Sequence, residues 1–411
     1  MKLLNLFRET KEGFEVKTWK RNLYLCWVGS FLTAAGMNLL IPFLPLYIAE
    51  LGESQNIEIW SSLAFSSTFL TAAIFSPIWG KLSDRYGRKP MLLRASLGMA
   101  IIMIMIGFAT SALQLVLLRL LMGAIAGFIP AAVILVASQT PANESGKTLG
   151  VLSTGGVAGM LIGPLIGGLL ADIVGFRQVF WITGAMLFVT FLISLLIKEE
   201  FKGEKVGSEK EKISKKHFLK LTAGIFMTTF LLQTAMMAMQ PLLTLYVKEL
   251  ASTSSYIAFL AGIVAAVSGI SNILAAPLLG KISDKTSPQM VLQVSLITVA
   301  IIIIFHVFVS HVWQLIALRF LLGFGLGGLL PAINTALKKK VPNSVIGMAY
   351  GYNQTAQHMG GVVGPLIGGV IAGRFGIASV FIVSSSLLFI NAAWVAFSRK
   401  RAGNLENEAA A

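Results

Sequence analysis

Long runs of apolar residues divide this chain into blocks of about membrane-spanning length. A spanning helix needs about 20 mostly apolar residues. The first runs of that length fall at 22–49, 59–80, 90–109, 113–137, 148–171 and 177–197. The later ones fall at 219–247, 257–280, 288–309, 313–337, 348–373 and 377–398. The pattern predicts an all-α polytopic membrane protein with twelve transmembrane helices in two six-helix bundles.

The polar stretches between these runs give the domain organisation. A charged segment separates the two sets of six helices, and we expect it to be a cytoplasmic linker. The segment before the first helix either lies along the membrane surface or is disordered. The predicted units are an N-terminal cytoplasmic segment, a bundle, the linker, a second bundle and a cytoplasmic tail, at 1–21, 22–197, 198–218, 219–398 and 399–411.

Lysine and arginine are distributed unevenly over the two sides of the predicted membrane. With the N-terminus in the cytoplasm, 28 of the 33 basic residues fall on the cytoplasmic side, 3 outside and 2 within the spans. Cytoplasmic loops of membrane proteins concentrate Lys and Arg. We therefore expect a multi-pass plasma-membrane protein with both termini in the cytoplasm. Separately, we expect it to be a monomer in the lipid bilayer.

Composition excludes several other classes of protein. The chain is 55% hydrophobic and 12% charged, with a mean hydropathy of +0.79. Soluble domains carry about twice that charge fraction, and disorder requires low hydrophobicity. The net charge of +15 is compatible with a nucleic-acid binder. Because the basic residues lie in short loops between apolar runs, we expect no nucleic-acid partner.

Signatures of catalysis are missing from the sequence. It contains no nucleotide-binding loop, no cluster with metal-ligand spacing and no nucleophile–histidine pattern. Cys26 is the single cysteine, so no intramolecular disulfide can form. We expect no enzyme activity, no metal and no cofactor, and a membrane receptor is a weaker alternative to a transporter.

The two halves repeat each other at a displacement of about 200 residues. Three blocks match, and they lie in the second, fourth and fifth spans of each half. An even number of spans per half relates the halves by an axis along the membrane normal, with a substrate site near the midplane between them. The matched blocks are Pro77–Asp84 with Pro277–Asp284, Arg119–Gly127 with Arg319–Gly327, and Gly163–Gly168 with Gly364–Gly369.

The short loop after the second span combines a glycine turn with several charges. Gly87 permits the turn, and the basic residues would anchor the loop in an anionic cytoplasmic leaflet. Alternatively, the basic residues only set the membrane topology. Asp84 argues against this, because an acid adds nothing to a positive-inside signal. The second-half loop keeps Asp284 without the later basic pair. The first loop reads Gly80-Lys-Leu-Ser-Asp84-Arg85-Tyr-Gly87-Arg88-Lys89-Pro90.

Two arginines and a glycine-rich helix mark the interior of the spans. Arg119 and Arg319 each lie about six residues inside a span. A buried arginine costs at least about 2.5 kcal/mol, so each should face a cavity or a partner, unless it snorkels to the outer interface. In the fifth span, glycines at four-residue spacing would let backbones approach closely, and a proline would bend the helix. These residues are Gly159, Gly163, Pro164, Gly167 and Gly168.

With these motifs the chain resembles the major facilitator superfamily, and more narrowly the twelve-helix drug:proton antiporters of the Gram-positive multidrug exporter type. The resemblance rests on the loop from Gly80 to Pro90, on Arg119 with its glycines and on the helix 5 motif, which marks exporters of the antiporter type. It implies secondary-active efflux of small amphipathic substrates, with the proton as coupling ion. Export of a sugar or other metabolite by the same fold is the alternative.

Polar residues at mid-helix depth are the candidates for a substrate cavity. Aromatic and methionine side chains near them would suit varied apolar ligands. Packing between helices is the alternative for each residue. The candidates are Asn38, Gln233, Gln240, Asn272, Asn334, Asn353, Gln354, Gln357 and His358.

The acidic residues depart from the pattern of many drug:proton antiporters, which carry a carboxylate deep in the membrane. Here Glu50, Asp172 and Glu249 lie at outer helix ends, and the remaining acids lie at inner ends or in loops. His358 is the only central group whose ordinary pKa lies near neutrality. A neutral, packed histidine is the alternative at that position.

The resemblance also implies a contact that closes the cytoplasmic side. Asp84 would meet the first turn of the eleventh span, near Gly347–Gly351, where free amides favour an anion. By pseudo-symmetry Asp284 would meet Gly146–Gly150 at the start of the fifth span. Because its loop lacks the later basic pair, we expect Asp284 to form the weaker contact.

Overall fold

The computed structural model describes residues 14–53, 55–141, 144–199, 215–252, 254–342 and 345–410. It describes no side chain at 14–17, 215–217, 220, 284 or 398–410. Within the described residues all regular secondary structure is helical. The predictions for 1–13 and most of the linker lie outside this part of the chain.

The described part of the first half contains six helical passages. Two of them are broken into a long and a short helix. The elements are α2 (Phe14–Leu39) with α3 (Leu44–Glu50), α4 (Ile57–Tyr86), α5 (Arg88–Gly107), α6 (Ala112–Ile125) with α7 (Phe128–Gln139), α8 (Ser145–Val174) and α9 (Phe176–Leu195).

The second half repeats this order. The elements are α10 (Lys215–Met239) with η1 (Gln240–Leu242) and α11 (Leu243–Leu250), α12 (Ile257–Lys285), α13 (Pro288–Phe305) with η2 (His306–Phe308), α14 (Val312–Leu326) with α15 (Leu329–Lys340), α16 (Ile346–Phe375) and α17 (Ile377–Ala410). Several helices run past their predicted apolar limits: α2 begins at Phe14 and α10 at Lys215, and α17 continues to Ala410. Lys, Arg, Glu and Ala favour helix in such stretches.

The apolar lengths agree with a polytopic membrane fold. In the described part of the chain, ten spans are long and apolar enough to cross a membrane, and the pair α2–α3, bent by 50°, makes an eleventh. Pro45 stands in the first turn of α3, and Pro241 lies in η1 at the matching break. The remaining passage is α16, whose 30 residues include a polar stretch from Asn353 to His358.

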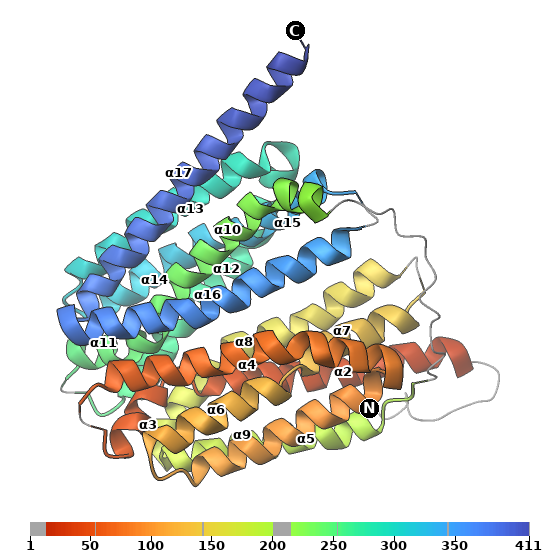
Figure 1. Cartoon of the computed structure of the whole chain (residues 1–411). Helices are drawn as coiled ribbons and strands as arrows, with labels where there is room; N and C mark the ends of the chain where they lie inside the picture. The colour runs from red at the N-terminus through yellow and green to blue at the C-terminus, as the bar shows by residue number, and fades with distance from the viewer. Residues whose placement is uncertain are drawn as a thin grey trace.

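Figure 1 shows the two halves side by side, with α2–α9 in red to yellow-green and α10–α17 in green to blue. Each half packs around its own apolar core. Between the halves the main contacts are α4 with α16 and α8 with α12, which correspond to each other under the repeat. Residues 84–89, 144–147, 198–199 and 338–342 lie at one end, which we call the linker end. Residues 50–53, 107–112, 174–176 and 254–257 lie at the other, which we call the far end.

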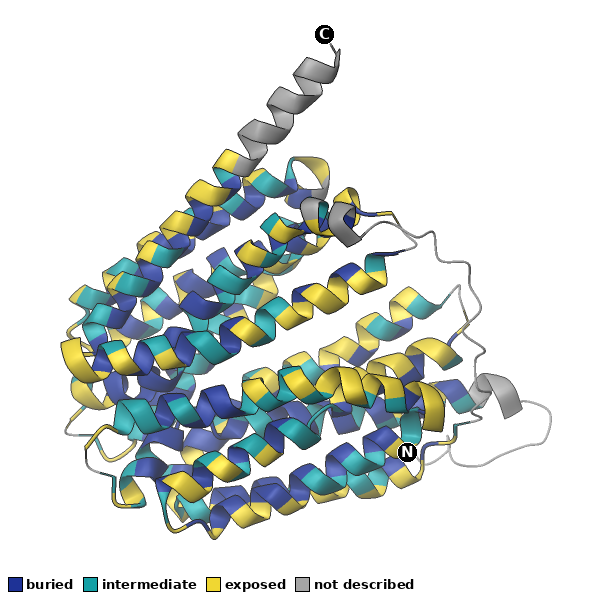
Figure 2. Cartoon of the chain, viewed as in Figure 1, coloured by how far each residue is buried: buried dark blue, intermediate teal, exposed yellow. Residues whose placement is uncertain are grey.

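The halves meet toward the far end and separate toward the linker end. A Cβ on Gly168 or Gly369 would touch the opposite half, whereas one on Gly150, Gly347 or Gly351 would have nothing within 4 Å. Figure 2 shows exposed residues along the linker-end half of α16. The space between the halves is therefore a wedge that opens at the linker end.

Candidate functional site

The short loop between α4 and α5 is a one-residue turn. Gly87 has a φ of +94°, which a residue with a Cβ rarely adopts, so a glycine is required there. Asp84 Oδ1 and Arg88 Nη2 lie 3.3 Å apart across the turn, and the Asp84 side chain is 67% exposed. Arg85 and Gly80 are also exposed. The predicted loop thus lies at the surface of the linker end.

Glu199 holds this loop from the end of α9. Its two carboxylate oxygens accept the backbone N–H groups of Arg88 and Lys89 at 2.8 and 2.7 Å. Lys89 Nζ donates in return to the carbonyl of Leu195 at 2.9 Å. The first turn of α5 contains no acid of its own, so Glu199 supplies the negative charge that a helix N-terminus favours. Glu199 falls within the predicted linker, and no sequence pattern around it indicates this contact.

Asn22 of α2 ties the residues that follow α9 to the rest of the first half. Its side chain is fully buried and donates to Gln139 Oε1 at 2.7 Å and to the Lys198 carbonyl at 2.6 Å. Its Oδ1 accepts the Lys198 N–H at 3.2 Å. Residues 198–199 therefore join α2, α5 and α7 at the linker end.

The predicted contact between Asp84 and the first turn of α16 is not formed in this arrangement. Gly347 and Gly351 have no neighbour within 4 Å of where a Cβ would be, and Asp84 instead pairs with Arg88. A wedge that is open at the linker end requires this contact to be broken. The backbone of Asp284 belongs to the last turn of α12, but its side chain lies outside the described residues.

Arg119 and Arg319 lie inside the two halves. Their relative exposures are 5% and 3%, so neither snorkels to the interface. The Arg119 guanidinium lies 5.9 Å from the ring centre of Phe65. Its Nε, and the Nε and Nη2 of Arg319, are buried without a hydrogen-bond partner among the described residues. Each half thus holds one desolvated cation on matching helices.

The glycines of α8 have two separate functions in packing. Gly159, Gly163 and Gly167 face α2; a Cβ on Gly163 would lie 2.7 Å from the carbonyl oxygen of Ala35. Gly168 instead faces α12 of the other half, next to Ala258.

The repeated glycines of α16 divide in the same way. Gly360, Gly364 and Gly368 face α10, whereas Gly361 and Gly369 face α4. The second-half motif therefore packs as its counterpart in α8 does. In both halves one glycine face builds the bundle and the other forms the contact between the halves.

The linker-end half of α16 lines the wedge. Gly361 faces Phe69 of α4, with its Cβ position 2.7 Å from that ring. Gln354 and His358 lie seven and three residues earlier, on the same helix face. Their Nε2 atoms are 3.5 Å apart, and the His358 and Phe69 ring centres are 6.3 Å apart. These three side chains combine amide, imidazole and aromatic surface where the halves begin to separate.

Further toward the linker end, a pocket of about 450 Å³ lies between α15 and α16. It contains the predicted cavity residue Asn334. The other lining residues are Thr335, Lys338, Lys339 and Tyr350.

Other predicted cavity residues lie within the bundles. Asn353 is 3% exposed, and its Oδ1 accepts the Thr229 hydroxyl at 2.7 Å. The interpretation of Asn353 as cavity lining was therefore wrong, because its helix face turns toward α10. Asn38 donates to the Ala34 carbonyl of its own helix at 2.7 Å. The partly buried candidates are Asn38, Gln233, Gln240, Asn272 and Gln357.

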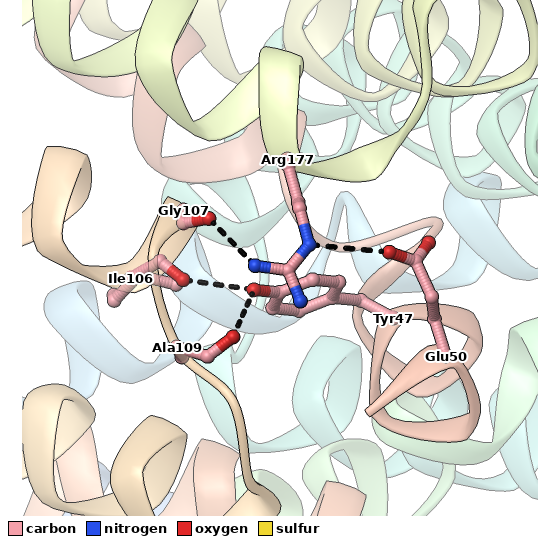
Figure 3. Close-up of polar contacts among 6 residues, drawn as sticks. All are labelled: Tyr47, Glu50, Ile106, Gly107, Ala109 and Arg177. Carbon is pink, nitrogen blue, oxygen red and sulfur yellow. Dashed lines mark hydrogen bonds and ion pairs between the residues drawn. The ribbon is translucent and has the colours of Figure 1, made fainter. Parts of the chain in front are cut away.

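A polar cluster braces the far end of the first half (Figure 3). The Tyr47 hydroxyl lies 2.9 Å from the Ile106 carbonyl oxygen. Arg177 reaches Glu50 Oε1 at 3.4 Å and donates to the Gly107 carbonyl at 3.2 Å.

The second half repeats part of this cluster. Tyr246 donates to the His306 carbonyl at 2.7 Å, as Tyr47 does to the equivalent residue. Both tyrosines belong to the sequence Pro-x-x-x-x-Tyr-x-x-Glu-Leu, at 42–51 and 241–250. This repeat block was visible in the sequence and was missed.

Comparison with known proteins places this architecture in a family. The sequence model described as Major Facilitator Superfamily matches residues 26–305 and 225–411. The chain belongs to the Major Facilitator Superfamily. The resemblance to this superfamily is thus confirmed. The chain is therefore a membrane transporter and not an enzyme, as predicted.

Similar sequences of this superfamily cover nearly the whole chain. Multidrug resistance protein MdtG of Enterobacter lignolyticus (strain SCF1) is 44% identical over 391 residues, 94% of each chain. The protein of the same name from Citrobacter koseri (strain ATCC BAA-895 / CDC 4225-83 / SGSC4696) is 46% identical over 394 residues, 93% of this chain and 96% of its own.

Solved structures of other Major Facilitator proteins share the fold at low identity. A bacterial homologue of the human lysosomal transporter Spinster, in an inward-facing and occupied conformation, superposes with a TM-score of 0.77 at 14% identity, covering 95% of this chain and 98% of its own. The nucleoside transporter NupG gives a TM-score of 0.76 at 14% identity, with 91% of this chain and 98% of its own covered. The predicted fold of two six-helix bundles is confirmed.

Proposed function

We propose that this chain is a secondary-active exporter that moves amphipathic drugs or toxic compounds across the plasma membrane in exchange for protons. The similarity to proteins named multidrug resistance protein MdtG, at 44–46% identity over more than nine tenths of the chain, supports the substrate class. The structural observation that carries the proposal is the wedge between the halves, closed at the far end and open at the linker end.

Alternating access requires two arrangements of the halves around one site. The glycine contacts of α8 with α12 and of α4 with α16 hold one of these arrangements. We place the linker and both termini in the cytoplasm, because 28 basic residues lie on that side and 3 on the other. The wedge then opens to the cytoplasm, from which an exporter takes its substrate.

The lining of the wedge supports amphipathic substrates. Phe69 and His358 offer ring faces, and Gln354 offers hydrogen-bonding groups to a polar end. Binding sites for such ligands are mostly apolar with a few polar groups that fix orientation. Both halves belong to one chain, so we propose a monomer in the lipid bilayer as the transporting unit, with the proton as coupling ion and no nucleic-acid partner.

Extrusion of a fluorescent cationic dye from loaded cells tests this proposal. Cells that express the chain should lose dye faster than cells with an empty vector. A protonophore should stop extrusion while cellular ATP is held constant. Extrusion that continues without a proton gradient would contradict proton coupling. If no dye in a chemically varied panel leaves the cells and a sugar does, the alternative of metabolite export is correct.

External protease tests the orientation. The linker should be cleaved in everted vesicles and protected in intact cells. Cleavage in intact cells would overturn the assignment of the cytoplasmic side.

A further inference from the structure

One acidic side chain reaches from the first half to the second at the far end. Asp172 lies in the last turn of α8, and its Oδ2 accepts the backbone N–H of Phe259 at 2.8 Å. Its Oδ1 lies 3.4 Å from the N–H of Ala258. Both amides belong to the first turn of α12, whose N-cap residue, Tyr256, makes no side-chain capping bond. Asp172 thus supplies the anion that this helix N-terminus favours.

A glycine sets the distance for this contact. Gly168 lies one helical turn before Asp172, on the same face of α8. A Cβ at that position would overlap the Ala258 carbonyl oxygen and lie 2.9 Å from the Phe259 Cα. Only without a side chain there do α8 and α12 approach closely enough for the carboxylate to reach the amides.

The contact exists on one side of the pseudo-symmetry axis. The position equivalent to Asp172 in α16 is Gly373, whose Cβ would meet only Ile59 of α4 at 3.8 Å. The other contact between the halves therefore packs closely but has no carboxylate at this place. Among the described side chains, Asp172 is the one carboxylate that accepts hydrogen bonds from the other half.

The charges around Asp172 are few. Of the helices packed against α8, α2 and α7 carry no charged residue at the far end, and the charged residues of α12 lie at its opposite end. Arg177 of α9 is paired with Glu50. No ion pair with Asp172 occurs among the described residues. Asp172 is partly exposed, so water and protons reach it from the far end.

We propose that Asp172 is a proton-binding group that latches the far end shut, so that its protonation from outside favours the arrangement open to the outside. The ionised carboxylate accepts two amide hydrogens from the other half. The neutral acid is a much weaker acceptor at a helix N-terminus, because charge-assisted hydrogen bonds are roughly twice as strong as neutral ones. This inference rests on the proposed function, and it locates one proton-responsive site in a chain without a mid-membrane carboxylate.

The direction of the effect separates Asp172 from other acids at this junction. Glu58 of α4 and Glu249 of α11 come from opposite halves and lie within electrostatic reach of each other. Repulsion between two ionised carboxylates from opposite halves would favour opening, whereas the contact of ionised Asp172 with the first-turn amides of α12 opposes it.

Spin labels placed on the far ends of α8 and α12, outside the contact residues, test the proposal on the purified full chain in lipid nanodiscs. Their distance distribution is measured by pulsed electron paramagnetic resonance from pH 8 to pH 4. In the parent protein, the population with separated far ends should grow as the pH falls. Asp172→Asn should hold the separated population near its acid level at every pH, about a tenfold change in the ratio at high pH.

Glu53→Gln is the matched control, because Glu53 is a far-end acid of the first half with no hydrogen bond or ion pair among the described residues. It should keep the pH response of the parent protein. Gly168→Ala should separate the far ends at every pH without removing any titrating group.

Three results would overturn the proposal. They are distances that do not change with pH in the parent protein, a pH response that survives Asp172→Asn, and a far end that closes in acid. If the pH response appears as described but no drug is transported, the latch stands and the proposed function fails. A purely structural cap would weaken thermal stability in Asp172→Asn and leave the pH response unchanged.

Discussion

Removing the charge of Glu199 should destabilise the first half by a predictable amount. Glu199→Gln keeps the size of the side chain and one carbonyl oxygen, but it loses the charge that faces two amides at 2.8 and 2.7 Å. Hydrogen bonds to a charged acceptor contribute about 1.5–3 kcal/mol, and an exposed charge at a helix N-terminus contributes about 0.3–1 kcal/mol. Because Glu199 is partly exposed and one acceptor remains, we expect a loss of about 1–2 kcal/mol.

Thermal unfolding of the purified protein in detergent, followed by fluorescence-detected size-exclusion chromatography, measures this loss. A loss of 1 kcal/mol lowers Tm by about 2–4 °C in a domain of 150–250 residues, so Glu199→Gln should melt about 2–8 °C below the parent protein. Glu144→Gln is the control, since Glu144 lies at the linker end before α8 and its side chain makes no hydrogen bond in the described structure. If both variants have the Tm of the parent protein, or if the Tm of both falls by the same amount, the Glu199 carboxylate does not cap α5.

The remaining predictions concern the moving parts. Asp84→Asn should strongly reduce export at matched expression, whereas Asp284→Asn should leave much of it. Equal residual export in the two variants would show that the two loops do not differ in function. His358→Gln should shift the pH profile of export if the imidazole in the wedge carries the coupling proton, and a profile identical to that of the parent protein would exclude that role. Oxidation of the pair Ile59→Cys and Gly373→Cys, in a background without the native cysteine, should cross-link the far end and stop export until a reductant is added. Full export by the cross-linked protein would show that the far end does not have to open.

The parts of the fold that follow local rules were predictable from the sequence. Apolar length located the spans, and Pro45 and Pro241 stand at the breaks before α3 and α11. The displacement of about 200 residues gave the pseudo-symmetry that the paired contacts of α8 and α16 now show. These features depend on residues close together in the chain, or on patterns long enough to stand out.

Contacts between distant residues were not predictable in the same way. Nothing near Glu199 indicates that its carboxylate caps a helix that begins 111 residues earlier. Asn353 and Gln354 are adjacent and lie at nearly the same depth in the membrane. Asn353 packs against α10 and Gln354 faces the wedge, because successive residues of a helix point to different faces. Asp172 was recognised only as an acid at an outer helix end, since its partner amides lie in the other half.

Transport by the purified chain in proteoliposomes tests the central claim most directly. With no ATP present and a lumen more acidic than the medium, molecules whose linker end faces the medium should drive a cationic dye into the lumen against its concentration gradient. A protonophore should release that dye. Accumulation that persists after the gradient is collapsed, or a complete absence of accumulation by protein that is folded and monodisperse, would contradict proton-driven export by this chain.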